Sequence, residues 1–208
     1  MSKLIYIEAS PLKSRSHTIA VARSFLEAYR SARPEDQIDH VDLWKTALPP
    51  FDGDTIEAKF AVLRHKEFGA EQLARWEAVR TVSPRFNAAD KYVFSVPMWN
   101  FGVPYPLKHY IDVVTLPDEN WTWSRARGYG TIFSGKKALM IYASANLHTS
   151  SGEDASDYQK PYLRRWSRFI GVNDVQEITV APTLADPDAV AVSRATAIRE
   201  ATRLATAF

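Results

Sequence analysis

YVFSVPMWNFGVPYPLKHYIDVV, residues 92–114, is the stretch of sequence that decides the fold of this chain. The apolar run 92–96 predicts a buried strand, which stops abruptly at Pro97. After a knot of turn residues and aromatics, apolar side chains recur at spacings of three and four: Leu107, Tyr110, Ile111 and Val114. The stretch therefore indicates a strand, a loop at its carboxyl end and an amphipathic helix.

The loop in this stretch, residues 97–104, is a candidate ligand site. In open α/β sheets, ligands bind at the carboxyl ends of the strands. Prolines stiffen the loop, and Gly102 allows the backbone to approach a partner closely. Because the loop is apolar and rigid, it suits a flat, uncharged ring better than a phosphate.

Strands and helices alternate along the rest of the chain. Further strands are expected at 4–9, 37–44 (an edge strand), 137–143 and 175–180. This alternation predicts a parallel sheet covered by helices on both faces. No GxGxxG motif follows the first strand, which argues against a dinucleotide-binding fold. We therefore expect a flavodoxin-like three-layer sandwich, with five strands in the order 2-1-3-4-5 and a single domain over 1–208.

Local signals mark the helix ends and the loops. Ser16 is the expected N-cap of the first helix, Asp54 could cap a helix over 56–63, and Gly171 is expected to end a helix over 162–170. Asp186 and Pro187 together predict the start of a final helix that runs to about residue 207. Residues 115–135 are expected to be a long irregular segment, and 144–156 a polar loop.

Composition argues against several classes of protein. The formal net charge of +2 is too small to indicate a nucleic-acid-binding protein. The chain has no cysteine, which excludes disulfides, thiolate chemistry and cysteine-based metal sites. The five histidines lack metal-ligand spacing, so no metal is assigned. No apolar run has the length of a membrane span and the first ten residues do not resemble a signal peptide, so a cytoplasmic protein is expected.

The loop after the first strand is a candidate phosphate site. It offers the hydroxyls of Ser10, Ser16 and Thr18 beside the backbone N–H groups of a helix amino terminus. Neutral donors and a helix dipole suit one phosphate. Alternatively, Ser16 simply caps the helix, which is the commoner role of such a serine. Taken with the apolar ring loop and the loop after the fourth strand, this loop points to flavin mononucleotide (FMN).

Four segments resemble the FMN-dependent NADH-azoreductase family: SPLKSRSHT (10–18), VPMWNFGVPYPLKHYIDVV (96–114), SGKKALMIYAS (134–144) and PYLRRWSRFIGVNDVQEITVA (161–181). They occur in order and span nearly the whole chain. The resemblance implies a flavodoxin-like homodimer with FMN at the subunit interface. It also implies ping-pong, two-electron reduction of quinones and azo dyes by NADH or NADPH.

The resemblance also implies roles for individual residues. The phosphate-binding positions are Ser10, Ser16, His17 and Thr18. The loop along the isoalloxazine ring is Pro97, Met98, Trp99, Asn100 and Phe101, whose backbone N–H groups would bond the N1/O2 and N5 edges. The third cofactor-binding loop is Ala143, Ser144, Ala145 and Asn146. In such a site the flavin supplies the hydride chemistry and the protein supplies orientation.

This chain departs from the family pattern at two places. Trp99 stands where the family typically has Tyr, and its larger ring can stack differently or narrow the substrate slot. After the fourth strand, residues 143–146 replace Ser-Arg-Gly-Gly. Losing both glycines removes easy left-handed conformations, but Asn146 can still adopt one, so FMN binding is expected to survive. Substrate and nicotinamide preferences are not inherited with the resemblance.

Three further residues are candidates for contact with substrate. His148 is the best candidate for a polar contact or proton donor, although a surface-loop histidine explains it equally well. Trp123 falls near an aromatic position in the loop with which the family walls its site. Phe169 matches a family residue that reaches the partner subunit's site, and a core phenylalanine is an equally good explanation.

These residues are compatible with three functions. The first is an FMN-dependent NAD(P)H:quinone oxidoreductase with azoreductase activity. The second is a flavodoxin-like FMN electron carrier that does not oxidise nicotinamides; such carriers are usually shorter and strongly acidic, unlike this chain. The third is a flavin-free binding protein, because a fold alone does not fix a function.

Overall fold

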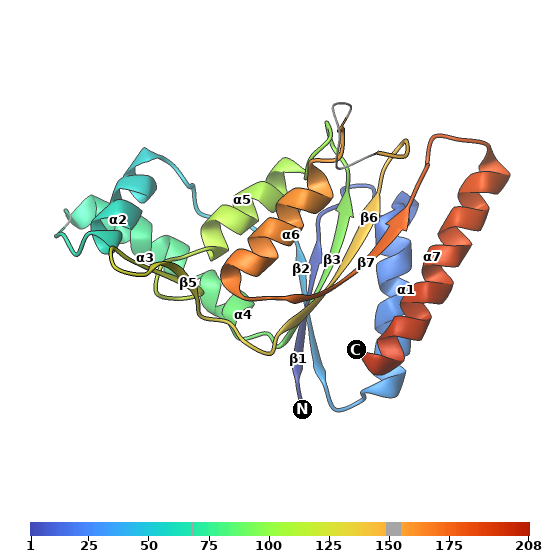
Figure 1. The fold of residues 1–208 in the computed structure, drawn as a ribbon, viewed down its shortest axis with the longest axis horizontal. Helices are drawn as coiled ribbons and strands as arrows, with labels where there is room; N and C mark the ends of the chain where they lie inside the picture. Colours follow the sequence, from blue (N-terminus) through green and yellow to red (C-terminus); the bar gives the residue numbers. More distant parts are fainter. Residues whose placement is uncertain (68, 149–154) are drawn as a thin grey trace.

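The computed structural model describes residues 1–67, 69–148 and 155–208, and a parallel five-stranded sheet forms its centre (Figure 1). The strand order is β2-β1-β3-β6-β7, which confirms the predicted order 2-1-3-4-5. The sheet consists of β1 (Lys3–Glu8), β2 (Gln37–Asp42), β3 (Lys91–Pro97), β6 (Lys137–Ala143) and β7 (Asp174–Val180).

Strand β3 lies at the middle of the sheet, between β1 and β6. Phe94 is in register with Ile7 on one side and Met140 on the other. Every residue from Tyr92 to Val96 is buried. This burial explains why the strand is apolar at almost every position, since helices cover both faces of a parallel sheet.

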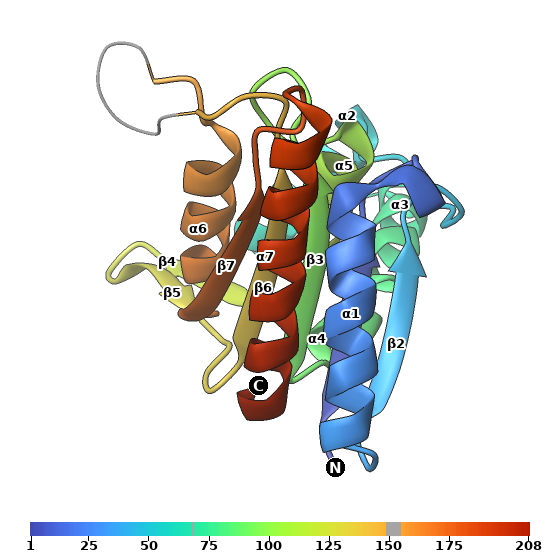
Figure 2. The ribbon, with the colours of Figure 1, turned by 90° about the vertical axis from the view of Figure 1, so that its right-hand side faces the viewer.

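Helices cover the two faces of the sheet, as Figure 2 shows for the pair α1 (His17–Ala32) and α7 (Pro187–Ala207). These two helices share a core with Leu4, Leu139 and other side chains on their face of the sheet. The opposite face carries α4 (Ser83–Asn87), α5 (Tyr105–Val114) and α6 (Gln159–Ile170). Their core contains Ile5 and Phe94. Alternating side chains of β1 therefore point into the two cores.

Several predicted helix ends are confirmed. The Ser16 side chain accepts a hydrogen bond from the Ile19 N–H at the start of α1. Asp186 caps α7 with Pro187 in the first turn. Gly171 ends α6 in the left-handed conformation, with φ of +93°. These ends depend on local backbone chemistry, which the sequence displays directly.

Two helix starts differ from the prediction. Asp52, not Asp54, is the N-cap of α2 (Gly53–Leu63), because its side chain accepts a hydrogen bond from the Thr55 N–H. Helix α6 begins at Gln159 rather than at residue 162. The Asp157 carboxylate accepts hydrogen bonds from the N–H groups of Gln159 and Lys160. The proline at 161 is tolerated in this first turn, because an N–H group there would have no acceptor within the helix.

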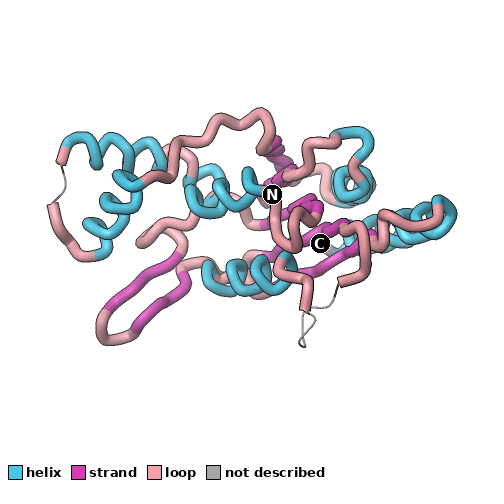
Figure 3. The backbone as a smooth tube through the Cα atoms, turned by 90° about the horizontal axis from the view of Figure 1, so that it is seen from above, coloured by secondary structure: helices cyan, strands magenta, loops and turns pink. Residues whose placement is uncertain are grey.

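The sequence predicted that residues 115–135 form a long irregular segment, but part of this segment is regular. They contain an antiparallel hairpin, β4 (Trp121–Ser124) and β5 (Gly128–Thr131). Trp121 is buried and anchors the hairpin against Phe169 of α6, with ring centroids 5.3 Å apart. Figure 3 shows the hairpin projecting to the same side of the molecule as α2 and α3 (Ala70–Arg80).

None of the helices in residues 1–67, 69–148 and 155–208 is long and apolar enough to cross a bilayer.

Candidate functional site

The loops after β1, β3 and β6 meet at the carboxyl edge of the sheet. The N–H of Ala9 donates to the Ser95 carbonyl at 3.1 Å, and the N–H of Met98 donates to the Ala143 carbonyl at 2.8 Å. The rings of Phe101 and His148 lie edge to face, with centroids 6.0 Å apart. Because the three strands are neighbours, the loops that the sequence singled out form one continuous rim.

The hydroxyls of the first loop are buried at the amino terminus of α1. Ser10, Ser16 and Thr18 are all almost fully buried. The Ser16 and Thr18 hydroxyls lie 3.1 Å apart, and the Ile19 N–H donates to Ser16 at 3.4 Å. The first N–H groups of a helix have no acceptor within the helix, so this end can accept an anion as well as a serine cap.

His17, the first residue of α1, carries an unused polar atom at this position. Its Nδ1 is buried and has no hydrogen-bond partner among the residues that the structure describes. Burial, together with the positive charge of Arg194, lowers the pKa of the imidazole. A buried polar atom usually has a partner, so this nitrogen is positioned for a group that the protein does not itself supply.

The ring loop after β3 closes as a tight turn. Trp99 and Gly102 exchange both backbone hydrogen bonds, at 3.0 and 2.9 Å. The two residues between them are left-handed, Asn100 with φ of +46° and Phe101 with φ of +69°. Sequence reasoning drew attention to Gly102, but the unusual backbone lies at its two neighbours. Such conformations cost energy for a phenylalanine and concentrate at functional sites.

This turn determines which backbone donors of the ring loop remain free. The N–H groups of Met98 and Trp99 are already bonded within the protein. Those of Asn100 and Phe101 donate to no residue in the described part of the chain. The Phe101 carbonyl accepts from the Tyr158 N–H at 3.0 Å, which ties the turn to the start of α6. The free donors are therefore at the tip of the turn.

Aromatic rings flank the tip on the side of β2. Trp99 lies 5.7 Å from Trp44 and 6.4 Å from Tyr105, measured between ring centroids. The Trp44 indole N–H donates to the Ala9 carbonyl at 3.0 Å. Sequence reasoning missed Trp44, although its place directly after the edge strand next to β1 was a usable signal.

The third loop is held by the segment that follows β7. The Ser144 N–H donates to the Val180 carbonyl at 3.3 Å, and the Thr183 N–H donates to the Ser144 carbonyl at 3.0 Å. The Ser144 hydroxyl bonds the Asn146 carbonyl at 2.7 Å. No residue from 143 to 148 is left-handed. The absence of glycine therefore leaves the described part of this loop unstrained; residues 149–154 of the predicted polar loop lie outside the described residues.

His148 lies where the third loop meets the ring loop. It is half-buried beside Phe101, and its Nδ1 is 2.9 Å from the Ser156 hydroxyl. The serine fixes the orientation of the ring. His148 therefore comes together with the predicted cofactor loops, as a substrate contact would require.

Trp123 and Phe169 lie elsewhere in the same chain. Trp123 is half-exposed on the hairpin, and Phe169 packs against Trp121 and Tyr129 near the end of α6. The opposite end of α6 touches the ring loop through Tyr158. Eleven residues of helix separate Tyr158 from Phe169, a rise of about 16 Å. Within one chain these two aromatics are therefore not brought to the three loops.

Two other kinds of site could exist among the described residues, a metal cluster and a cavity away from this rim. The structure groups no three His, Asp or Glu side chains around a possible metal position within its described residues. A hollow of about 690 Å³ lies at the amino ends of β1 and β2, lined by residues that include Lys3, Gln37 and Arg85. It includes no residue of the three loops.

Comparison with known sequences gives a consistent family. A family model described as flavodoxin-like fold matches residues 2–204. The FMN-dependent NADH:quinone oxidoreductase 9 of Burkholderia lata is 39% identical over 212 residues, covering 100% of both chains. The FMN-dependent NADH:quinone oxidoreductase of Desulfotalea psychrophila is 38% identical over 205 residues, covering 99% of this chain and 97% of the relative.

Solved structures with the same fold include azoreductases. An azoreductase from Bacillus anthracis str. Sterne superposes with a TM-score of 0.88 at 22% identity, covering 100% of both chains. An FMN-dependent NADH-azoreductase from Bacillus anthracis str. Ames Ancestor, solved in complex with FMN, gives a TM-score of 0.82 at 26% identity. That match covers 99% of this chain and 100% of the other.

Proposed function

The chain belongs to the flavodoxin-like family of FMN-dependent NADH:quinone oxidoreductases, and from this membership we propose a homodimeric enzyme that reduces quinones and azo compounds. The donor is NADH or NADPH, and the two half-reactions follow a ping-pong order. The reaction takes place in the cytoplasm, where nicotinamide nucleotides are available, and each subunit is one domain. The observation that carries the proposal is the meeting of three donor-bearing loops at one edge of the sheet.

The first loop holds the phosphate of FMN. Ser10, Ser16 and Thr18 supply hydroxyls, and the first N–H groups of α1 supply charge-free donors and a favourable dipole. The unpartnered Nδ1 of His17 adds a further polar group. This set of donors fits a single phosphate. A phosphate bound there would also give the unpaired Nδ1 of His17 a partner.

The second and third loops hold the isoalloxazine ring. Pro97, Met98 and Trp99 would lie along the ring, and Asn100 and Phe101, whose N–H groups are free in the described chain, would donate to its polar edge. Ala143, Ser144, Ala145 and Asn146 of the third loop would hold the pyrimidine end. The rigid turn holds these donors in place before the cofactor binds, which lowers the entropy lost on binding.

When bound, FMN supplies the hydride chemistry of both half-reactions. The protein orients the acceptor: Trp99 and Phe101 offer exposed apolar rings against which a quinone can stack. His148, whose Nδ1 lies 2.9 Å from the Ser156 hydroxyl, would donate a proton to the oxygen or nitrogen that becomes reduced.

A second subunit completes the site in this proposal. The rim around the three loops exposes apolar side chains that a monomer would leave in water, Phe101 at 52% and Tyr105 at 68% exposure among them. Trp123 and Phe169, which lie too far from the loops of their own chain, would wall the partner's site.

The visible spectrum of the purified protein tests this proposal. After loading with FMN, NADH or NADPH without air should bleach the flavin absorbance, and a quinone should restore it. A flavin that neither nucleotide bleaches would instead favour the electron carrier. A protein that takes up no FMN would overturn the proposal and favour a flavin-free binding protein.

A further inference from the structure

The short loop between β1 and α1 contains a strained residue that the proposed site does not explain. Lys13, in the single-turn helix η1 (Lys13–Arg15), has φ of +50°. A left-handed backbone is unfavourable for an L-residue with a side chain, and the loop has no glycine to adopt it. A strained backbone of this kind persists only where surrounding contacts hold the residue in that conformation.

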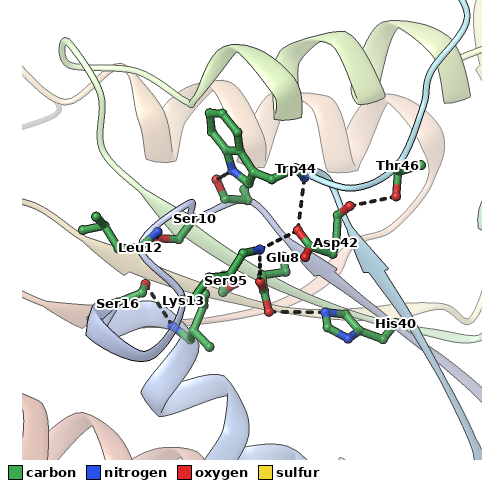
Figure 4. A network of polar contacts seen from close by, with 12 residues as sticks. Glu8, Ser10, Leu12, Lys13, Ser16, His40, Asp42, Trp44, Thr46 and Ser95 are labelled. Carbon is green, nitrogen blue, oxygen red and sulfur yellow. Dashed lines mark hydrogen bonds and ion pairs between the residues drawn. The ribbon is translucent and has the colours of Figure 1, made fainter.

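Two carboxylates supply those contacts. The Lys13 ammonium lies 2.6 Å from Glu8 Oε1 and 2.6 Å from Asp42 Oδ1 (Figure 4). Glu8 is the last residue of β1 and Asp42 the last residue of β2, so the ammonium joins the carboxyl ends of two strands. The Glu8 side chain is only 7% exposed. Removing one partner of a short ion pair with a buried carboxylate is costly, because it leaves the buried charge without a partner.

The rest of the network fixes the carboxylates themselves. His40 contacts the second oxygen of Glu8 at 3.3 Å, and the Trp44 N–H donates to Asp42 at 3.1 Å. Burial raises the pKa of Glu8, but hydrogen bonds from His40 and Lys13 outweigh burial and hold the pKa below its usual value. Glu8 is therefore ionised at neutral pH and retains Lys13.

We propose that Lys13 is a positioning residue that folds the phosphate loop without binding the phosphate itself. Its ammonium is satisfied by two carboxylates, so it brings no surplus positive charge to the loop. Its backbone lies next to the hydroxyls instead: the Ser16 N–H donates to the Lys13 carbonyl at 3.0 Å. By fixing Lys13, the two carboxylates fix the place of Ser16 and hence the start of α1. This inference rests on the proposed FMN site.

Three variants separate positioning from direct binding of phosphate. K13M keeps an unbranched side chain that is one atom shorter and removes its charge, while E8Q keeps the shape of the buried partner. K45M is the matched control, because Lys45 is exposed and makes no ion pair with any residue in the described part of the chain. Dissociation constants for FMN and for riboflavin, which lacks the phosphate, are measured by quenching of flavin fluorescence.

If Lys13 positions the loop, K13M and E8Q each weaken FMN binding by about tenfold and leave riboflavin binding unchanged within about twofold. The double variant is then no weaker than K13M, because K13M already removes the contact between Lys13 and Glu8. If E8Q instead tightens FMN binding, the freed ammonium binds the phosphate directly and the inference is overturned. Unchanged FMN affinity in K13M would overturn it as well.

Amide hydrogen exchange of the flavin-free protein gives a reading that does not depend on FMN. The N–H groups of Arg15 and Ser16, which bond within the loop, should exchange at least about tenfold faster in K13M and E8Q than in the wild type and K45M. Unchanged exchange would overturn the inference even if FMN binds. Conversely, faster exchange in a protein that binds no FMN would support the positioning role of Lys13 and refute the proposed function.

Discussion

Several residues at the rim are strained or unpaired, although buried atoms without a partner in the described chain also occur away from it, for example at Asn120 and Trp121. Lys13, Asn100 and Phe101 have positive φ within two of the three loops, and His17 buries a nitrogen without a partner in the described chain. In the core, even buried hydroxyls such as that of Tyr92 find an acceptor. Three left-handed residues and one unpaired nitrogen therefore coincide with the loops that we propose to bind the ligand.

A carboxylate away from the site determines part of the pH dependence of stability. Hydrogen bonds from Tyr29 and from the Ser2 N–H, with a further bond from Lys91, hold the pKa of Asp36 at about 2. Because the pKa of Asp36 is lowered on folding, its charge stabilises the folded state at pH values above the ordinary pKa of 3.8. This stabilisation is lost as the pH falls towards 2. We expect Asp36→Asn to lower the free energy of unfolding by about 1 to 2 kcal/mol at pH 6.

Urea unfolding at pH 6, 4 and 3 measures this effect. The gap in unfolding free energy between wild type and Asp36→Asn should shrink as the pH falls. Asp54→Asn is the control, because Asp54 is exposed and makes no ion pair with a described residue. A gap that stays constant down to pH 3 would show that the Asp36 contacts do not depend on its charge.

We expect Trp99 to limit the size of acceptor that the proposed site admits. Its indole packs against Trp44 and Tyr105 and is 37% exposed. Trp99→Tyr removes one ring and opens the slot beside the turn. We expect KM for a two-ring quinone to fall by roughly threefold to tenfold relative to a one-ring quinone. Steady-state assays with both acceptors measure the ratio; an unchanged ratio would mean that Trp99 does not contact the acceptor.

At the scale of elements, helix α6 depends on the glycine at its end. Gly171 has φ of +93°, and a Cβ added there would collide with the Phe133 carbonyl. Gly135 also has positive φ, but a Cβ added there meets no atom within 4 Å. Gly171→Ala should therefore lower the free energy of unfolding by about 3 kcal/mol or more, because a clash adds to the conformational cost.

Gly135→Ala is the matched control for that change. It carries the conformational cost alone, so a loss of about 1 kcal/mol is expected. Thermal and urea unfolding of the two variants provide the measurement. Equal losses would mean that the backbone near Phe133 moves aside, and that Gly171 is needed only for its conformation.

The hairpin β4–β5 illustrates why one element escaped prediction. Its strands have four residues each and include Gly128 and Gly130, which weaken any strand signal. Their stability comes from Trp121, which packs on Phe169 of a helix that lies more than forty residues later. A two-stranded hairpin is marginal by itself, so its sequence alone carries little information.

At the scale of the whole molecule, the proposed dimer predicts that two defective chains complement one another. A Ser16→Ala, Thr18→Ala chain lacks the phosphate site, and a Phe169→Ala chain lacks the ring that we place in the partner's site. In a mixed dimer, one of the two sites combines intact loops with an intact Phe169. Random pairing at equal amounts should then give about a quarter of wild-type activity, since half of the dimers are mixed.

Co-refolding of the two variants, followed by an NADH:quinone assay, measures this complementation. Each variant refolded alone sets the baseline. If the activity of the mixture is only the mean of the activities of the two variants, Phe169 does not contribute to the site of the partner subunit.

The sequence by itself determined the order of the sheet, most helix ends and the three loops of the rim. The helix ends and the positions of the loops follow from signals between near neighbours: the apolar run 92–96, the Ser16 cap, and glycine or proline at helix termini. They can be read within a few residues, because secondary structure and capping depend on local backbone chemistry. The order of the sheet follows instead from the alternation of strands and helices along the whole chain.

Only the tertiary structure decided how the rim is shaped. Lys13 meets a carboxylate that lies 29 residues further on, and Trp44 meets Trp99 across a distance of 55 positions. Asn100 and Phe101 keep free N–H groups because they form the tip of the turn that Trp99 and Gly102 close, and Met98 ties this turn to the neighbouring strand β6. Such contacts depend on which segments become neighbours in space, and local sequence patterns do not contain that information.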